Sequence, residues 1–346
     1  MGNIVSVLIA ILILGVLIMV HEFGHFVAGR LLGFDVYQFA IGFGPKIWQK
    51  KKGKTLYSIR ALPLGGFCAF DNENSLTKGE LEFNKKPIWK RLIVILSGPF
   101  MNIVVAYIVV VILLAGVGLN AVSPQIDVVN PDTPAQVSGL MEGDIFLEAN
   151  GMTIGDDVMV LHNAISESKG QPVKLLIQRG NEKLELSLKP EYIESQNRYM
   201  IGIDLTQVKE RMGFFQALGN GFVASGNMIK ELLSFLGRLV TRGEGADQVA
   251  GPLGSVDIIS QVTRSWDVGR ILEMIAFISM NLGVFNLLPI PPLDGGKVVF
   301  MGVEAVRGKQ LTLETEGKIQ MVGFALFILL ALVLTYKDIT RMFFGG

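Results

Sequence analysis

The chain has a single cysteine, Cys68, among its 346 residues. One thiol cannot form an intramolecular disulfide, and no CxxC metal knuckle is possible, so we expect Cys68 to be a small packed apolar residue. Charge is also scarce: 18% of the residues are charged, and 31 Lys and Arg balance 31 Asp and Glu. A chain without a basic excess gives no sign of a nucleic-acid partner.

Hydrophobic residues, by contrast, are abundant. They make up 50% of the chain, and the mean hydropathy of +0.46 is too high for a soluble globular protein and low for a bundle of spans alone. About 20 apolar residues are needed to cross a bilayer, and four segments have this length: residues 3–30, 92–118, 271–291 and 319–336. We therefore expect a polytopic α-helical membrane protein with four transmembrane helices and one sizeable soluble domain.

Only three histidines occur, and two of them, His21 and His25, belong to the run HEFGH inside the first apolar segment. Residues i and i+4 share one helix face, so both imidazoles can bind one metal ion. Glu22 then lies beside that metal, where a carboxylate can accept a proton from a metal-bound water. HExxH also arises by chance in long soluble chains. Two histidines and a glutamate at membrane depth are costly unless they act, which favours a metal site.

Basic residues are distributed unevenly between the spans. The region 119–212 has more acidic than basic residues, whereas the loop from Arg30 to Arg91 has twelve Lys and Arg against five acids: positions 30, 46, 50, 51, 52, 54, 60, 78, 85, 86, 90 and 91. The positive-inside rule predicts that this loop is cytoplasmic, with the N-terminus, region 119–212 and the C-terminus outside. The HEFGH run then lies near the cytoplasmic end of the first span.

A catalytic zinc ion takes three protein ligands and leaves one position for water, so the two histidines need a third donor. His162 falls in the soluble region across the membrane, and we expect it to be a surface or capping residue. Asp294 follows the third span at the same depth as the histidines, after prolines that open the helix toward a cavity. The alternative is that Asp294 is the N-cap of a cytoplasmic helix starting near Lys297.

The loop after the first span is rich in strand-forming residues. Segments 36–41, 46–50 and 56–61 alternate or are β-rich, and turns are predicted at 42–45, 52–53 and 63–66. Two interpretations remain open: a β-hairpin region (35–70) that enters the membrane shielded by the helices, or an ordinary cytoplasmic hairpin.

The soluble region reads as short strands with one or two helices. After it, residues 213–241 predict an amphipathic helix that lies on the outer membrane surface or packs on the soluble domain, and residues 243–254 predict a loop. The expected organisation is a first membrane half (1–118), a soluble domain (119–209), an amphipathic helix and loop (210–262) and a second membrane half (263–346).

These motifs together resemble the site-2 intramembrane zinc metalloprotease family of the bacterial regulator-of-sigma-E protease type. The resemblance spans nearly the whole chain. It rests on HEFGH, on Gly42-Phe43-Gly44, on the SGPFMN run at 97–102, on Asn286-Leu287-Leu288-Pro289-Ile290-Pro291-Pro292-Leu293-Asp294-Gly295-Gly296, and on the PDZ-like SGLMEGD run at 138–144 followed by Gly251-Pro252.

The resemblance implies a zinc metalloendopeptidase, with a membrane-associated β-sheet and one inserted extracytoplasmic PDZ-like α+β domain. By this resemblance, His21, His25 and Asp294 bind Zn2+ and Glu22 is the general base. The implied substrate-binding residues are Asn286, Pro289 and Pro291, which shape a groove, and Gly42, Phe43 and Gly44, the edge to which an unwound substrate adds as a strand. The chain departs from many relatives at Lys297, where they have His, and it has room for one PDZ domain only.

The implied substrates are membrane-spanning proteins or peptides in the inner (plasma) membrane, such as anti-sigma factors or remnant signal peptides. The PDZ ligand is not indicated. Two other classes fit parts of the pattern. A metal or proton transporter would use the same three ligands as an intramembrane relay, but it predicts ionisable residues in the other spans, which are apolar. A PDZ-bearing scaffold with a structural zinc would need a fourth protein ligand.

Overall fold

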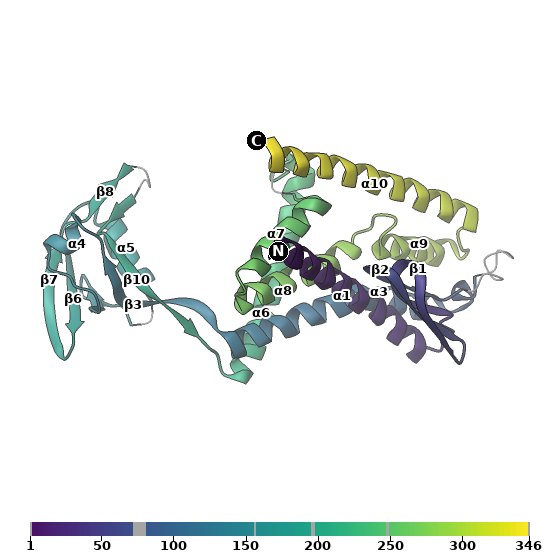
Figure 1. The fold of residues 1–346 in the computed structure, drawn as a ribbon, viewed down its shortest axis with the longest axis horizontal. Helices are drawn as coiled ribbons and strands as arrows, with labels where there is room; N and C mark the ends of the chain where they lie inside the picture. The colour runs from purple at the N-terminus through teal and green to yellow at the C-terminus, as the bar shows by residue number, and fades with distance from the viewer. Residues whose placement is uncertain (1, 72–80, 156, 195–197, 247–248, 345–346) are drawn as a thin grey trace. The chain divides into compact units, whose positions relative to one another are not determined.

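The computed structural model describes residues 2–71, 81–155, 157–194, 198–246 and 249–344. The chain forms two compact units. The first combines the residues up to Val117 with those from Met212 onward, and the second is Gly118–Arg211. Figure 1 shows the helices of the first unit and the strands of the second.

Among the described residues, four helices are long and apolar enough to cross a membrane. Their apolar parts cover Ile4–Leu31, Ile88–Val117, Val268–Asn286 and Leu313–Arg341. They belong to α1 (Gly2–Leu31), α3 (Ile88–Ile112) with the π-helical turn η2 (Leu113–Val117), α8 (Val268–Asn286) and α10 (Leu313–Phe344). The third ends five residues before the predicted end at 291, because prolines at 289, 291 and 292 cannot continue a helix.

Helices α1 and α3 lie side by side (Figure 1) and cross at two glycines. A Cβ atom on Gly24 of α1 would collide with the carbonyl oxygen of Ser97 on α3, and a Cβ on Gly98 would collide with the imidazole of His25. On its other side α3 contacts α8, where the Ser279 hydroxyl donates to the backbone carbonyl of Asn102 at 2.8 Å. These contacts place the middle of α3 directly against the HEFGH run.

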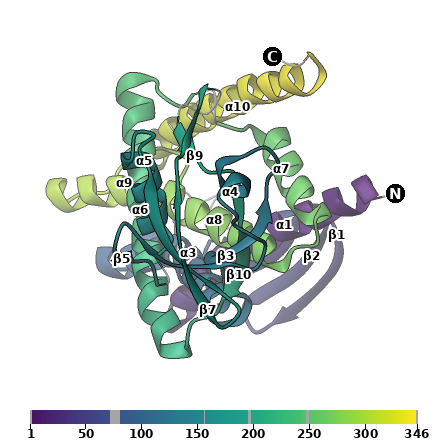
Figure 2. The ribbon, with the colours of Figure 1, turned by 90° about the vertical axis from the view of Figure 1, so that its left-hand side faces the viewer.

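Two long strands, β1 (Gln38–Lys52) and β2 (Thr55–Ala69), run side by side in Figure 2. Both are bent, so residues 38–41 of β1 lie between two parts of β2. On one side they pair antiparallel with 66–69; on the other the partner number rises with the residue number, from 56 opposite 38 to 59 opposite 41. Tyr37 shows the same arrangement, because its N–H donates to Ala69 and its carbonyl accepts from Leu56.

The turn predicted at 63–66 is wrong, and the bend of the two strands gives the reason. Residues 62–69 are extended and form the outermost segment of the sheet, although the Gly65-Gly66 pair is typical of a turn. Helix α1 packs against β2 far more than against β1. The free edge at 66–69 therefore faces the HEFGH helix. This placement depends on the pairing of distant strand segments, which local composition does not reveal.

Helix α9 (Asp294–Arg307) is fastened to α3 by a buried ion pair. The Arg91 guanidinium donates to both carboxylate oxygens of Glu304, at 2.9 and 2.5 Å, and the two side chains are 4% and 13% exposed. Because Asp294 is the first residue of α9, this pair fixes the helix that carries Asp294 to the helix that carries Gly98.

We expect the Glu304→Gln variant to lose about 3–5 kcal/mol of stability, because it leaves a buried guanidinium without its counter-charge. A thermal denaturation of the purified chain in detergent measures the effect as a lower midpoint. Glu314→Gln is the matched control: Glu314 pairs with Lys318, both side chains are more than 70% exposed, and a change of less than about 0.5 kcal/mol is expected. Equal midpoints for the two variants would contradict the role of the Arg91–Glu304 pair.

The segment after the soluble region is more helical than predicted. Helix α6 (Phe214–Arg242) covers the predicted amphipathic helix, and Gly243 ends it in the left-handed region. The predicted loop at 243–254 is wrong at its end, since α7 (Pro252–Arg264) starts with Pro252. Proline suits the first helical turn, because its missing N–H would be unpaired there. Asp338 of α10 accepts from the N–H groups of Gly251 and Gly254, which holds α10 to the start of α7.

The second unit is an α+β domain. Its main sheet has the strand order β10-β3-β4-β6-β7, with β5 beside β4, and β8 pairs with β9. The elements are β3 (Leu119–Val129), α4 (Pro134–Val137), β4 (Ile145–Ala149), β5 (Met152–Thr153), α5 (Met159–Glu167), β6 (Val173–Arg179), β7 (Glu182–Leu188), β8 (Glu191–Ile193), β9 (Arg198–Met200) and β10 (Ile203–Glu210).

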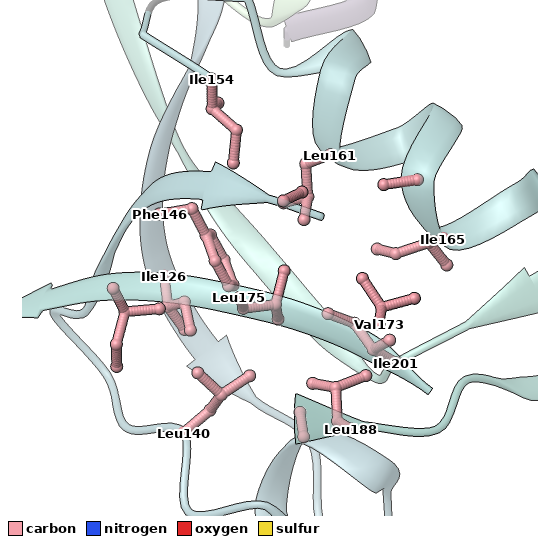
Figure 3. Packing of buried hydrophobic residues seen from close by; sticks show 14 residues of the cluster. Ile126, Leu140, Phe146, Ile154, Leu161, Ile165, Val173, Leu175, Leu188 and Ile201 are labelled. Atoms are coloured by element: carbon pink, nitrogen blue, oxygen red, sulfur yellow. The ribbon is translucent and has the colours of Figure 1, made fainter. Parts of the chain in front are cut away.

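This unit has its own hydrophobic core. In Figure 3, the Phe146 ring extends toward Leu175 of the sheet, and Leu161 and Ile165 of α5 belong to the same cluster. The third histidine, His162, lies on the exposed face of α5, as predicted for a surface residue. Asp144, the last residue of the SGLMEGD run, is buried and closes the turn before β4: it accepts from the N–H of Met141 at 2.9 Å and from Arg179 at 2.7 and 2.8 Å.

We expect Asp144→Asn to destabilise a segment covering 118–211 by about 1.5–3 kcal/mol at pH 7, the usual range for hydrogen bonds to charged groups. Burial favours the protonated acid, but the hydrogen bonds from Arg179 and Met141 hold the pKa of Asp144 below its usual range. Its contribution is therefore complete above the ordinary pKa of an aspartate and is lost as the pH falls through the lowered value.

Urea denaturation at pH 7 and pH 3 measures both effects. The native segment should lose stability on acidification, and Asp144→Asn should lose less, because the responsible group is gone. Asp204→Asn, at an exposed position, is the matched control and should stay within about 0.5 kcal/mol of the native segment. The same pH dependence in the Asp144→Asn variant would contradict the assignment.

Candidate metal centre

Three side chains from two distant parts of the first unit converge on one point. His21 and His25 come from α1, and Asp294 comes from the first turn of α9. The two Nε2 atoms are 3.2 Å apart, and they lie 3.0 and 3.2 Å from Oδ2 of Asp294. Both histidines are buried, and the Asp294 side chain is 13% exposed.

This arrangement fits a zinc ion. Bonds of about 2.0–2.1 Å in a tetrahedral site place neighbouring donor atoms roughly 3.3 Å apart, close to all three separations here. Oδ2 of Asp294 is buried and accepts no hydrogen bond within the described residues. A buried carboxylate oxygen without a donor is costly, and a cation bound between the three atoms removes that cost. Two histidines and one carboxylate are a donor set of catalytic zinc sites.

Helix α3 contacts the far side of both imidazoles. Nδ1 of His25 donates to the backbone carbonyl of Val94 at 2.7 Å, which leaves its Nε2 free to bind a metal. The side-chain amide of Asn102 lies 3.3 Å from Nδ1 of His21, measured from Nδ2. Between them, Gly98 has no side chain to fill the space that the two Nε2 atoms occupy.

A cavity of about 690 Å³ opens beside these three side chains. Its wall includes Glu22, His21, His25, Asp294 and the β2 segment from Phe67 onward. Glu22 lies beside the sheet edge, because a Cβ atom on Gly66 would be 3.8 Å from Cγ of Glu22. Cys68 was expected to be a small packed apolar residue. It is half-buried, and it also lines the cavity.

Of the three residues predicted to shape a groove, one lines this cavity. Asn286 lines it, but its side-chain Nδ2 donates to the carbonyl of Leu282 and so continues α8. Pro289 and Pro291 are outside the cavity wall in the described ranges, and the carbonyl of Pro291 instead touches α10 at Gly323. Lys297 lines the cavity.

Gly42, Phe43 and Gly44 lie in the bend of β1, and the Phe43 ring stacks on Phe67 of β2. Both glycines have positive φ, and a Cβ on Gly42 would meet the carbonyl oxygen of Leu62. Phe43 pairs with Leu62 across the sheet. These three residues therefore shape the sheet, and the segment nearest Glu22 is 66–69.

Asp294 is the first residue of α9, whose N-cap is Leu293, so the helix begins three residues earlier than the N-cap alternative requires. The Gly295-Gly296 pair lies close to the protein's own backbone in the turn after α8. A Cβ on Gly295 would collide with the carbonyls of Leu287 and Leu288. The turn after α8 can therefore fold tightly under α9, which aims Asp294 at the histidines.

Comparison with known proteins decides the family. Residues 9–330 match the sequence profile of peptidase family M50. The chain belongs to this family. It is 30% identical to the "Regulator of sigma-W protease RasP" of Bacillus subtilis, over 98% of this chain and 99% of that protein. It is 29% identical to the "Zinc metalloprotease RasP" of Bacillus licheniformis, with the same coverage of both.

This M50 peptidase is accordingly a zinc metalloprotease and a multi-pass protein of the inner (plasma) membrane. A solved structure, the PDZ domain of the SdrC-like protein (Lin2157) from Listeria innocua, is 27% identical over 24% of this chain and 92% of its own length, with a TM-score of 0.22.

Sequence reasoning missed three features of the M50 site. They are the edge segment 66–69, the Arg91–Glu304 pair, and the contact of Asn102 with His21. Only Asn102 has a local signal, because an amide in the middle of an apolar span requires a polar partner. The other two depend on which distant segments meet.

Proposed function

We propose that this M50 peptidase hydrolyses peptide bonds within or near transmembrane segments of other proteins. In this proposal His21, His25 and Asp294 hold the zinc ion and Glu22 is the general base. The observation that carries it is the convergence of three donor atoms within 3.2 Å, from segments more than 260 residues apart, next to a cavity-lining glutamate.

The chemistry follows from the positions of these groups. The bound zinc supplies a water of lowered pKa and polarises the scissile carbonyl. Glu22 accepts the proton of that water and delivers it to the leaving amine, a role open to a carboxylate that shares a cavity with the ligands. Glu22 lies beside the sheet edge at Gly66. A closed structural site would need four protein ligands, and the cluster formed by the described residues offers three.

We propose that the substrate adds as a strand at the edge 66–69. A peptide bond inside a helix is shielded by its own hydrogen bonds, so a transmembrane substrate must unwind and needs new partners for its backbone. The outer edge of a sheet offers N–H and C=O groups on alternate residues. This edge lines the cavity from Phe67 onward, whereas Gly42, Phe43 and Gly44 keep the sheet bent.

The orientation follows from charge. We propose that residues 30–91, with their basic excess, are cytoplasmic, and that residues 119–209 form an extracytoplasmic PDZ-like domain between the two membrane halves 1–118 and 263–346, with 210–262 as the linking helices. Both termini are then outside and the zinc site lies near the cytoplasmic face. Cysteines introduced by Lys52→Cys and Asn181→Cys in a Cys68→Ser chain test this: an impermeant maleimide should label the second on intact cells and the first only after lysis. The reverse labelling would overturn the orientation.

The proposed substrates are membrane proteins already trimmed outside the membrane, such as anti-sigma factors or remnant signal peptides. The similarity to a protein named for sigma-W regulation supports the first class. An extracytoplasmic PDZ-like domain suits such a role, because it can exclude a bulky untrimmed ectodomain or bind a new terminus.

Reconstitution tests the function. The full chain in lipid vesicles should cleave a model transmembrane peptide at a bond near the cytoplasmic end, read by mass spectrometry. A zinc chelator should stop the reaction and added zinc should restore it. Failure to cleave any embedded peptide while an extended soluble peptide is cleaved would overturn the intramembrane assignment.

A further inference from the structure

The turn-by-turn contacts of α3 with the two histidines follow a regular spacing. Val94, Gly98 and Asn102 are four residues apart and so lie on one face of α3. This face supplies a carbonyl for Nδ1 of His25, an empty space for the two Nε2 atoms, and an amide at Nδ1 of His21. The polar contacts of α3 are therefore made at Nδ1 of each imidazole, whereas Asp294 meets each Nε2.

Asn102 is the polar side chain of this face, and its surroundings are unusual. It is 0% exposed, and its Oδ1 accepts no hydrogen bond within the described residues. A buried amide in an apolar span is costly without partners. The Ser279 hydroxyl of α8 bonds only to the backbone carbonyl of Asn102 and not to its side chain.

The position of the proton on the His21 ring determines whether Asn102 must accept or donate a hydrogen bond there. A neutral imidazole that binds a metal through Nε2 carries its proton on Nδ1, and that N–H needs an acceptor. The two ends of an Asn amide have the same shape, so rotation about the Cβ–Cγ bond places Oδ1 at Nδ1 of His21 without moving the helix. An Nδ2 group in that place would set donor against donor.

We propose that Asn102 is a positioning residue for the zinc site: its Oδ1 accepts the Nδ1–H of His21, fixes the ring and keeps Nε2 free for the metal. The inference rests on the proposed ligand set. With the carbonyl of Val94 acting in the same way on His25, one face of α3 orients both histidines. Groups that orient metal ligands in this way change metal affinity by about 10–100-fold when removed.

Zinc affinity is the decisive measurement, since it does not depend on turnover. The full chain in detergent is titrated against a chelator of known zinc affinity. Asn102→Leu, similar in shape but without an acceptor, should bind zinc about 10–100-fold more weakly. Asn102→Asp keeps an acceptor and loses the donor, so its affinity should stay close to native. Asn102→Ser, too short to reach Nδ1, should behave as the Leu variant and replaces it if that protein does not fold.

Two further variants separate the possible failures. Ser279→Ala removes the interhelical bond to Asn102 but keeps the acceptor at His21, so zinc affinity should be unchanged. Asp294→Asn tests the ligand set itself. Native-like zinc binding by Asn102→Leu and Asn102→Ser, or equal losses in Asn102→Asp and Asn102→Leu, would overturn the role of Asn102. Zinc binding that is insensitive to Asp294→Asn would instead overturn the proposed function.

Discussion

The Glu22→Gln variant should bind zinc as the native chain does and lose about 10²–10⁴-fold in the rate of cleavage of a model transmembrane peptide. An amide has almost the same shape as a carboxylate, but it cannot accept a proton from water. The loss should appear in kcat, because Glu22 acts on the reacting water and not on substrate binding. Mass spectrometry of the products and a zinc titration measure the two quantities.

Glu316→Gln is the matched control, with the same chemical change in the wall of the same cavity. Glu316 is far along the chain on α10 and accepts from Gln320, so cleavage should stay near the native rate. Cleavage by Glu22→Gln at the native rate would show that another group takes the proton.

The Asp294→Asn variant should lose zinc affinity by more than about 100-fold, because removal of a direct ligand exceeds the usual effect of groups that only orient ligands. The neutral amide lacks the negative charge that a dication needs in a buried site. Inactivity should follow from the missing metal, and high added zinc should restore part of the activity. Metal analysis after dialysis provides the measurement.

Asp71→Asn is the control for this change, since Asp71 lines the same cavity and is not among the three converging donors. Its zinc content should equal that of the native chain. Full zinc occupancy of the Asp294→Asn variant would mean that a different residue completes the site.

The residues of the proposed zinc site could be found because each carries a strong local or topological signal. HEFGH stands in an apolar helix where ionisable residues are costly, and the positive-inside rule predicts Asp294 at the same depth. The structure brings these residues within hydrogen-bonding distance of one another.

The sheet beside the site was only partly predictable. Strands were predicted from composition at 36–41, 46–50 and 56–61, but residues 63–66, which belong to the extended segment 62–69, were taken for a turn. Its glycines are there because Gly66 passes close to the carbonyl of Ala40 and Gly65 beside Phe43. Local sequence shows that such residues bend easily, and it does not show which chain passes beside them. Helix α7 was missed for a similar reason, since Asp338, far away on α10, caps its start.

The sequence by itself therefore determined the four apolar segments and the i, i+4 spacing of His21 and His25, because hydropathy and spacing are local properties. It predicted Asp294 as their partner from topology. Only the tertiary structure decided which sheet edge faces Glu22, how Arg91 and Glu304 hold α9, and that Asn102 reaches His21. Those features depend on close approach between distant segments, which glycine at 24 and 98 permits and which no single stretch of sequence encodes.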